Sequence, residues 1–257
     1  MNYEFNEGVS ELRVYSASDT GAMRKNNQDA CLTGHLEGGG VYAVVCDGMG
    51  GASGGSIASG KACGEIGRRI ETGYRDKMTA GSVRNVLESA INSANVLVFE
   101  QAQADPCLTG MGTTVVCAVA FGSKIVIAHA GDSRAYLYSN NCIRQVTSDH
   151  SVVQDMINRG QITEDEALVH PRRNVITRAL GVDDRIDIDF FEAACEPGCA
   201  VLLCTDGFSN YVSKDEIADV LKNNPLSETP DIFIGLANER GGSDNITVAV
   251  IDIMEEF

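Results

Sequence analysis

Four aspartates stand at or beside the ends of apolar, β-rich runs, and this placement constrains the fold more than any other feature of the 257-residue chain. Asp47 closes the run VYAVVCD, Asp132 follows IVIAHAG, Asp206 follows AVLLCT, and Asp244 precedes NITVAVID. A strand holds such a carboxylate firmly, while the adjoining loop exposes it. Carboxylates gathered in one place repel one another, so a bound cation is expected among them. The sequence therefore predicts a hard-metal site where several strands end.

Composition limits the class of protein. Hydrophobic residues make up 44% and charged residues 22% of the chain, as in an ordinary soluble globular protein. No apolar run reaches the ~20 residues of a membrane helix, and MNYEFNEGVSELRVY lacks the basic-then-apolar order of a secretory signal. The net charge of −16 disfavours nucleic acid and anionic membranes as partners. We therefore expect a cytoplasmic protein without a membrane segment.

The nine cysteines are predicted to be reduced and mostly structural. Their odd number argues against a disulfide framework, and several stand inside apolar runs, as Cys46 and Cys117 do. Cys195 and Cys199 form the only close pair, with no second pair to complete a zinc site.

Short strands and longer helices alternate in groups. Strands are predicted at 10–18, 40–46, 112–121, 124–130, 133–139, 186–191, 199–205 and 245–253, and helices at 53–72, 80–104, 213–222 and 228–239. Short turns such as Gly122-Ser123 and Asn140-Asn141 favour antiparallel pairing. Strand groups flanked by helix pairs predict an α+β layered sandwich rather than a doubly wound sheet.

The stretch at about 147–181 differs from the rest, because it is polar and charged and contains two short helical pieces and a proline. It either gates or contacts a substrate, or it is a variable surface insert. With no internal repeat and no low-complexity linker, residues 1–257 are expected to form a single domain that carries this flap-like excursion.

Near the N-terminus, SDTGAMRKNNQDA places Arg24 five residues before Asp29. Taken alone, an arginine near an aspartate is usually a surface ion pair. Beside the other aspartates, its guanidinium becomes a candidate clamp for a phosphate group.

Eight short motifs follow one another along nearly the whole chain. They are D-T-G-x-x-R-x-x-N-Q-D-A (19–30), V-C-D-G-M-G-G (45–51), M-G-T-T (111–114), A-G-D-S-R (130–134), T-x-D-H-S (147–151), T-R-A-L-G (177–181), L-L-C-T-D-G (202–207) and G-S-D-N-I-T (242–247). Each motif alone is weak. In this order they resemble the PP2C-type metal-dependent protein phosphatases in their compact bacterial form.

The resemblance implies a four-layer α-β-β-α sandwich with two central, mostly antiparallel sheets. It also implies two Mn²⁺ or Mg²⁺ ions, with Asp47 bridging them, the Gly48 carbonyl on one ion, and Asp206 and Asp244 on the other. All-oxygen ligation suits these hard cations. In this family a water activated by the two metals attacks phosphorus in line, with no covalent intermediate.

Further roles come from the same resemblance. Arg24 would bind the substrate phosphoryl group, and Asp29 would order water around the metals. Asp132 would help to hold a third, weaker metal, sharing Asp206. The glycines at 48, 50 and 51 are expected to let the backbone come close to the metal cluster. The implied substrates are phosphoserine and phosphothreonine in proteins, a partner Ser/Thr kinase and its targets are reasonable expectations, and the phosphatase is expected to be a monomer.

Three positions depart from the animal members of the family. Met49 replaces the histidine proposed there as the general acid, so the sequence names no proton donor. Gln28 replaces an acidic residue, which removes a negative charge near the metals. Asn210 stands where an acidic residue is frequent, which leaves the ligands of the third site open.

The histidines have two interpretations. His150, in T-x-D-H-S, and His170, before Pro171, either contact the substrate or act only as hydrogen-bonded loop residues, and the second interpretation is favoured. His35 and His129 are expected to be incidental.

Two other functions are open to this sequence. Asp187-Ile188-Asp189 superficially offers the D-x-D motif of haloacid-dehalogenase phosphatases, which use a nucleophilic aspartate, but it lies on a polar strand edge. A catalytically weak regulator that only binds phosphoproteins would be expected to lack metal carboxylates, whereas Asp47, Asp206 and Asp244 are all present.

Overall fold

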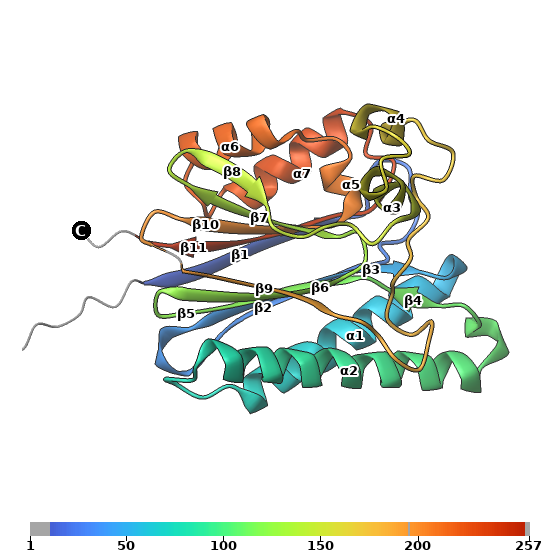
Figure 1. The fold of residues 1–257 in the computed structure, drawn as a ribbon, viewed down its shortest axis with the longest axis horizontal. Helices are drawn as coiled ribbons and strands as arrows, with labels where there is room; N and C mark the ends of the chain where they lie inside the picture. Colours follow the sequence, from blue (N-terminus) through green and yellow to red (C-terminus); the bar gives the residue numbers. More distant parts are fainter. Residues whose placement is uncertain (1–10, 195, 255–257) are drawn as a thin grey trace, which may run out of the picture.

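Two antiparallel sheets lie face to face between two layers of helices (Figure 1). This arrangement is seen in a computed structural model that describes residues 11–194 and 196–254. It confirms the predicted α+β class and the four-layer α-β-β-α order.

The first sheet has the strand order β1-β11-β10-β7-β8. Its strands are β1 (Leu12–Asp19), β11 (Ile246–Ile253), β10 (Ala200–Cys204), β7 (Arg134–Ser139) and β8 (Cys142–Gln145). The second sheet has the order β2-β3-β5-β6-β9, with β4 paired to β3. Its strands are β2 (Asp29–His35), β3 (Val41–Met49), β5 (Val115–Phe121), β6 (Lys124–Ala130), β9 (Asp189–Ala194) and β4 (Gly112–Thr113).

Helix pairs cover the outer face of each sheet (Figure 1). The second sheet carries α1 (Gly51–Gly73) and α2 (Ala80–Ala104), and the first carries α5 (Asp206–Ser209), α6 (Lys214–Asn223) and α7 (Thr229–Glu239). Two short 3₁₀ turns are η1 (Glu37–Gly39) and η2 (Pro106–Leu108). Among the helices of the described part of the chain, none is both long and apolar enough to cross a membrane.

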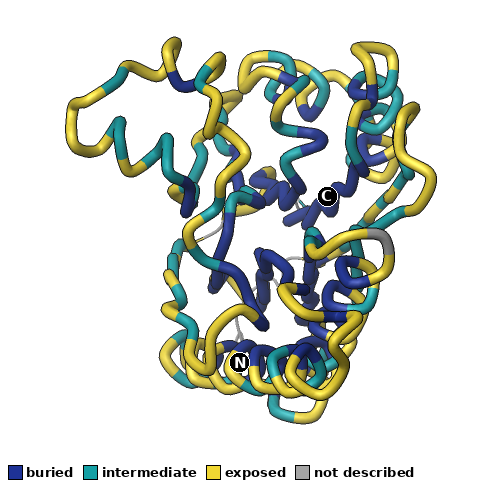
Figure 2. The backbone as a smooth tube through the Cα atoms, turned by 90° about the vertical axis from the view of Figure 1, so that its right-hand side faces the viewer, coloured by how far each residue is buried: buried dark blue, intermediate teal, exposed yellow. Residues whose placement is uncertain are grey.

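The period of two in the central strands explains why the layers stack. In β3, Tyr42, Val44 and Cys46 face the α1–α2 layer. The alternate residues of the same strand face the other sheet, as Val41 and Val45 do. A third cluster fills the space between the first sheet and its helices. Figure 2 shows buried backbone through the middle layers and exposed backbone on the outside. An inner strand is therefore apolar on both faces, as the sequence pattern indicated.

The antiparallel register brings the predicted aspartates to one end of the sheets. Asp47, near the end of β3, stands directly opposite Asp29 at the start of β2. The end of β10 pairs with the early part of β11, so Asp206 and Asp244 flank the same end of that ladder. Strand ends that are far apart in sequence are therefore neighbours in space.

The helix predictions agree with the structure to within two residues at each boundary, and 80–104 is matched at both ends. The strand predictions missed β2 and β8. Both are edge strands of their sheets and mostly half-buried or exposed, so neither shows the apolar run that marks an inner strand. Ser10, the first residue of the strand expected at 10–18, lies outside the described residues.

The segment 147–181, called the flap segment below, contains α3 (Val152–Asn158) and α4 (Glu164–Leu168). These are the two short helical pieces expected from the sequence. An isolated bridge between Ser151 and Ile176 closes the base of the segment. Its two helices lie beside α5, at the end of the molecule where the aspartates gather (Figure 1).

The eight cysteines among the described residues are all free thiols. Six of them are buried or half-buried, and Cys107 and Cys142 are exposed. Cys195 lies outside the described residues. Cys199, the other member of the close pair, is a free thiol, as predicted.

Candidate metal centre and active site

The structure brings all four strand-end aspartates to one cavity. Asp47, Asp132, Asp206 and Asp244 line a space of about 590 Å³, together with Arg24. Another space, of about 570 Å³, lies at the start of β1 and the β2–β3 loop, and none of the four aspartates lines it. The chemistry predicted from the sequence is therefore concentrated in the first cavity.

Asp47 is fixed by two threonines of the M-G-T-T block. Its backbone N–H donates to the Thr114 hydroxyl at 2.9 Å, and its carbonyl accepts from the Thr113 hydroxyl at 2.8 Å. The Thr114 hydroxyl is also 2.7 Å from the Ser133 hydroxyl, one residue after Asp132. These bonds hold the loop between β6 and β7 against the end of β3.

Asp29 is held from the other sheet. Its Oδ2 accepts from the hydroxyls of Thr205 at 2.9 Å and Thr247 at 2.7 Å. Its Oδ1 is buried and has no hydrogen-bond partner in the described part of the chain. A buried carboxylate oxygen without a donor is costly, so this atom is suited to a ligand or an ordered water.

Arg24 and Asp244 form an ion pair across the mouth of the cavity. Arg24 Nη2 lies 2.8 Å from Asp244 Oδ2, and both side chains are partly exposed. Asp206 begins α5, and its Oδ2 accepts a 3.3 Å hydrogen bond from Asn210. Arg24 is thus the cationic side chain placed directly against the aspartate cluster.

Burial and crowding raise the pKa of Asp29, Asp47, Asp132 and Asp206. Burial is the main cause at each, and neighbouring carboxylates add to it. The pKa of Asp29 rises to about 7, with contributions from Asp206 and Asp244. That of Asp132 also rises to about 7, again with Asp206 as the leading charge. The pKa of Asp47 lies well above its usual range, with Asp29 as its strongest charged neighbour.

These observations fit a pair of hard divalent cations. The cluster holds more negative charge than Arg24 can neutralise, and the free Oδ1 of Asp29 faces no donor. Within the described residues, however, no three His, Cys, Asp or Glu side chains converge closely enough to hold an ion by themselves. Water and backbone oxygens must therefore complete any coordination sphere, as hard cations such as Mg²⁺ allow.

Gly48 near the end of β3, and Gly50 and Gly51 after it, all line the carboxylate cavity, and close packing restricts the first two positions to glycine. A Cβ on Gly48 would lie 2.1 Å from the Gly55 carbonyl oxygen, and one on Gly50 would lie 2.5 Å from Met111 Cα. At Gly51 there is open space, and glycine is favoured there by a φ of +77°. The loop therefore needs glycine to seat the start of α1.

Asn245 is a supporting residue that the sequence reasoning missed. Its Nδ2 donates to the carbonyls of Thr20 at 2.9 Å and Asn26 at 3.0 Å, and its Oδ1 accepts from the Gln28 N–H at 2.8 Å. It thereby pins the loop that carries Arg24. The only signal in the sequence is that Asn245 stands directly beside Asp244. Thr205, which stands beside Asp206, was missed in the same way.

The three departures from the animal pattern have visible consequences. Met49 lines the cavity and carries no proton to donate. Gln28 donates from Nε2 to the Gly51 carbonyl at 2.6 Å, so it braces the glycine loop. The Asn210 amide donates a hydrogen bond to the Asp206 carboxylate, whereas an acidic side chain at position 210 would repel that carboxylate.

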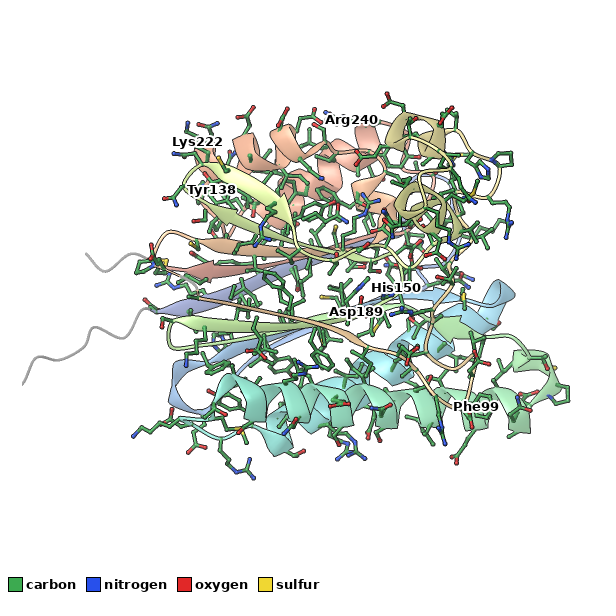
Figure 3. All side chains as sticks on the ribbon, viewed as in Figure 1. Phe99, Tyr138, His150, Asp189, Lys222 and Arg240 are labelled. Carbon is green, nitrogen blue, oxygen red and sulfur yellow. The ribbon has the colours of Figure 1, made fainter. Side chains whose placement is uncertain are left out.

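His150 is hydrogen-bonded to both backbone polar groups of Gly131, the residue before Asp132. Its ring Nδ1 accepts from the Gly131 N–H at 3.0 Å, and its backbone N–H donates to the Gly131 carbonyl at 2.8 Å. Because Nδ1 accepts, the ring proton sits on Nε2 and is donated to Asp189 Oδ2 at 3.1 Å. Figure 3 shows His150 and Asp189 side by side. Arg178 donates to the other oxygen of Asp189 at 3.0 Å.

This geometry agrees with the favoured interpretation of His150 as a residue that orients backbone. Asp189 is occupied by His150 and Arg178, so the Asp187–Asp189 pair does not supply a nucleophile to the carboxylate cavity. His170 accepts a local 3.1 Å bond from the Arg172 N–H, again as a loop residue. His129 is buried, and its ring stacks on His150 at 4.6 Å between centroids.

Comparison with known proteins gives a consistent family signal. The sequence profile of the family Protein phosphatase 2C matches residues 22–231. The chain is 37% identical over 247 residues to serine/threonine phosphatase stp of Listeria welshimeri, covering 91% of this chain and 93% of that protein.

Solved structures agree. The crystal structure of serine/threonine phosphatase Stp1 from Staphylococcus aureus has a TM-score of 0.88 and 34% identity, covering 99% of this chain and 100% of that chain. The catalytic domain of the phosphatase PstP, in complex with two manganese ions, has a TM-score of 0.83 and 30% identity, covering 95% of this chain and 99% of that chain.

The raised pKa values predict how stability depends on pH without metal. Asp29 and Asp132 keep protons up to about pH 7 when folded, but lose them near pH 3.8 when unfolded. The folded chain therefore binds more protons between these values, so its stability falls as pH rises through this window. With EDTA present, the melting temperature should drop by several degrees from pH 5 to pH 7.5, at about 2–4 °C per kcal/mol.

Mn²⁺ should reverse this trend, because the ions stabilise the deprotonated cluster most where it is fully charged. Asp29→Asn should flatten the metal-free pH dependence. Differential scanning calorimetry across pH measures both effects. A metal-free melting temperature that rises from pH 5 to pH 7.5 would contradict the raised pKa values.

The two nitrogens of His150 can be tested separately. His150→Asn keeps an acceptor near the Nδ1 position, whereas His150→Gln keeps a polar group near Nε2 and loses the bond from Gly131. Loss of a hydrogen bond worth about 1 kcal/mol should speed amide exchange at Gly131 about fivefold in the glutamine variant. The asparagine variant should exchange more slowly than the glutamine variant. Equal exchange at Gly131 in both variants, measured by NMR, would count against the clamp.

Proposed function

The chain belongs to the protein phosphatase 2C family, and we propose that it hydrolyses phosphoserine and phosphothreonine in proteins with the help of two divalent metal ions. The observation that carries this proposal is the cluster of buried, mutually repelling carboxylates with one arginine in the same cavity. That combination matches the needs of a dianionic phosphate ester held beside cations.

The proposed ligands divide between two ions. Asp47 would be shared by both, the Gly48 carbonyl would help to hold one, and Asp206 and Asp244 would help to hold the other. Asp132 and Asp206 are the proposed ligands of a third, weaker ion. When bound, Mn²⁺ or Mg²⁺ would lower the pKa of water and offset negative charge on the phosphoryl group. Support comes from the shared cavity and from the manganese ions in the related PstP structure.

Arg24 would change partner as the site fills. In this structure its guanidinium is paired with Asp244 at 2.8 Å. A cation that takes the Asp244 oxygen weakens this pair, because the carboxylate is then neutralised. The freed guanidinium, on a partly exposed side chain, can donate two hydrogen bonds to a phosphoryl oxygen pair.

Asp29 would orient water rather than touch the substrate. Thr205 and Thr247 fix its Oδ2, so the direction of the unpaired Oδ1 is set by the two central strands. A water that donates to Oδ1 is thereby held in one orientation. Met49 supplies no proton to the leaving oxygen, which separates this site from that of the animal members.

The biological setting is also part of the proposal. The substrates would be phosphorylated proteins, among them a Ser/Thr kinase and its targets. Neither nucleic acid nor membrane lipid would be a partner. The net charge of −16 supports that exclusion. We further propose that the protein is a cytoplasmic monomer, which agrees with the free cysteines of the described residues. We also propose one catalytic domain over 1–257, because β1 and β11, from opposite ends of the chain, pair with each other.

The activity is tested with p-nitrophenyl phosphate and a phosphothreonine peptide, each with Mn²⁺ or with EDTA. Asp206→Asn should lower kcat about 100-fold or more, because it removes a charge from the metal cluster. Asp219→Asn, on the exposed face of α6, is the matched control and should leave kcat unchanged. Turnover that is insensitive to EDTA, or an unaffected Asp206 variant, would contradict the metal-dependent reaction and point to a covalent route.

A further inference from the structure

A second cavity of about 510 Å³ adjoins the carboxylate cavity beneath the flap segment. The two share Asp132, Asn174 and Asp206 among their lining residues, so one opens into the other. The second cavity lies between the flap helices on one side and the start of α6 on the other. Any polypeptide that places a phosphorylated side chain among the aspartates has this space within reach.

Arg134 and Asp149 on the floor of the second cavity neutralise each other, while Glu164, Arg173 and Lys214 line it elsewhere. Arg134 makes a bidentate pair with Asp149, with bonds of 2.9 Å from Nε to Oδ1 and 2.6 Å from Nη2 to Oδ2. Gln145 donates to Asp149 as well, at 3.2 Å. Because these groups satisfy one another, Arg134 and Asp149 are not available to a charged ligand.

One strip of the flap wall of this cavity is apolar, beside polar and charged flap residues such as Gln154, Glu164 and Arg173. Val153 and Ile157 lie one turn apart on the same face of α3, and both are half-buried. Ala167 and Leu168 of α4 continue the wall, and Leu168 is 68% exposed. A large apolar side chain that stays open to water beside an adjoining cavity is available for contact with a ligand.

We propose that this cavity binds an apolar side chain of the phosphoprotein substrate, from a residue close in sequence to the phosphorylated one. The inference rests on the proposed phosphatase function and adds a selectivity to it. Continuity with the carboxylate cavity identifies the occupant as the substrate chain itself. The apolar strip formed by Val153, Ile157 and Leu168 favours an aliphatic or aromatic side chain at that wall.

The test uses short phosphothreonine peptides of Gly and Ser in which a single Leu is moved through the positions on either side of the phosphothreonine. At one or more positions, Leu should raise kcat/KM about tenfold over Ser, the discrimination expected for one apolar side chain in a pocket. Leu168→Ser and Ile157→Ser should each remove most of that preference. Neither should change kcat/KM for p-nitrophenyl phosphate, which is too small to reach the second cavity.

Val169→Ser is the matched control. Val169 is 82% exposed and adjacent to Leu168 in sequence, but it does not line the cavity. This variant should keep the full preference for Leu. Melting temperatures of the three variants report whether the flap segment remains folded.

The outcomes distinguish a failure of the apolar subsite from a failure of the phosphatase function. If all peptides and p-nitrophenyl phosphate are hydrolysed with Mn²⁺ but no position prefers Leu, the apolar subsite is wrong and the phosphatase function stands. If Val169→Ser loses the preference as fully as Leu168→Ser, the cavity is not the cause and the proposal is overturned. If the wild-type protein hydrolyses none of these substrates with Mn²⁺, the proposed function itself fails.

Discussion

Mutual repulsion among buried carboxylates is the constraint on which the rest of this structure depends. Asp29 and Asp47 stand directly opposite each other on paired strands, and Asp206 and Asp244 approach from the other sheet. Two facing sheets are needed to bring these residues together, because no single sheet places all of them at one edge. Burial raises the pKa of Asp29, Asp47 and Asp206, so the folded chain carries an electrostatic cost that bound cations can remove.

Neutral side chains keep this charged cluster in place. Hydroxyl groups of Thr205 and Thr247 fix Asp29, and the Asn245 amide fastens the loop that carries Arg24. His150 acts in the same way from the flap segment, through both sides of the Gly131 peptide. The base of the flap segment is thus hydrogen-bonded to the loop that carries Asp132.

Periodicity and motif order were enough to predict the layered fold, the long helices and the aspartates of the cavity. Each of these follows from local features, such as the apolar stripe of α2 or the run that ends at Asp47. The edge strands β2 and β8 were not predicted, because edge strands need little apolar surface. The part played by Asn245 was missed for another reason. Its partners are carbonyls more than two hundred positions away, which no local pattern encodes.

Calorimetric titration of the metal-free protein with Mn²⁺ near pH 7, in buffers of different ionisation enthalpy, tests the central claim most directly. It counts the bound ions and the protons released with them. We predict about two tightly bound ions per chain, with proton release because Asp29 has a pKa of about 7, and at least tenfold weaker binding in Asp47→Asn. Binding without proton release, or with unchanged affinity in that variant, would contradict a cation site built from crowded carboxylates.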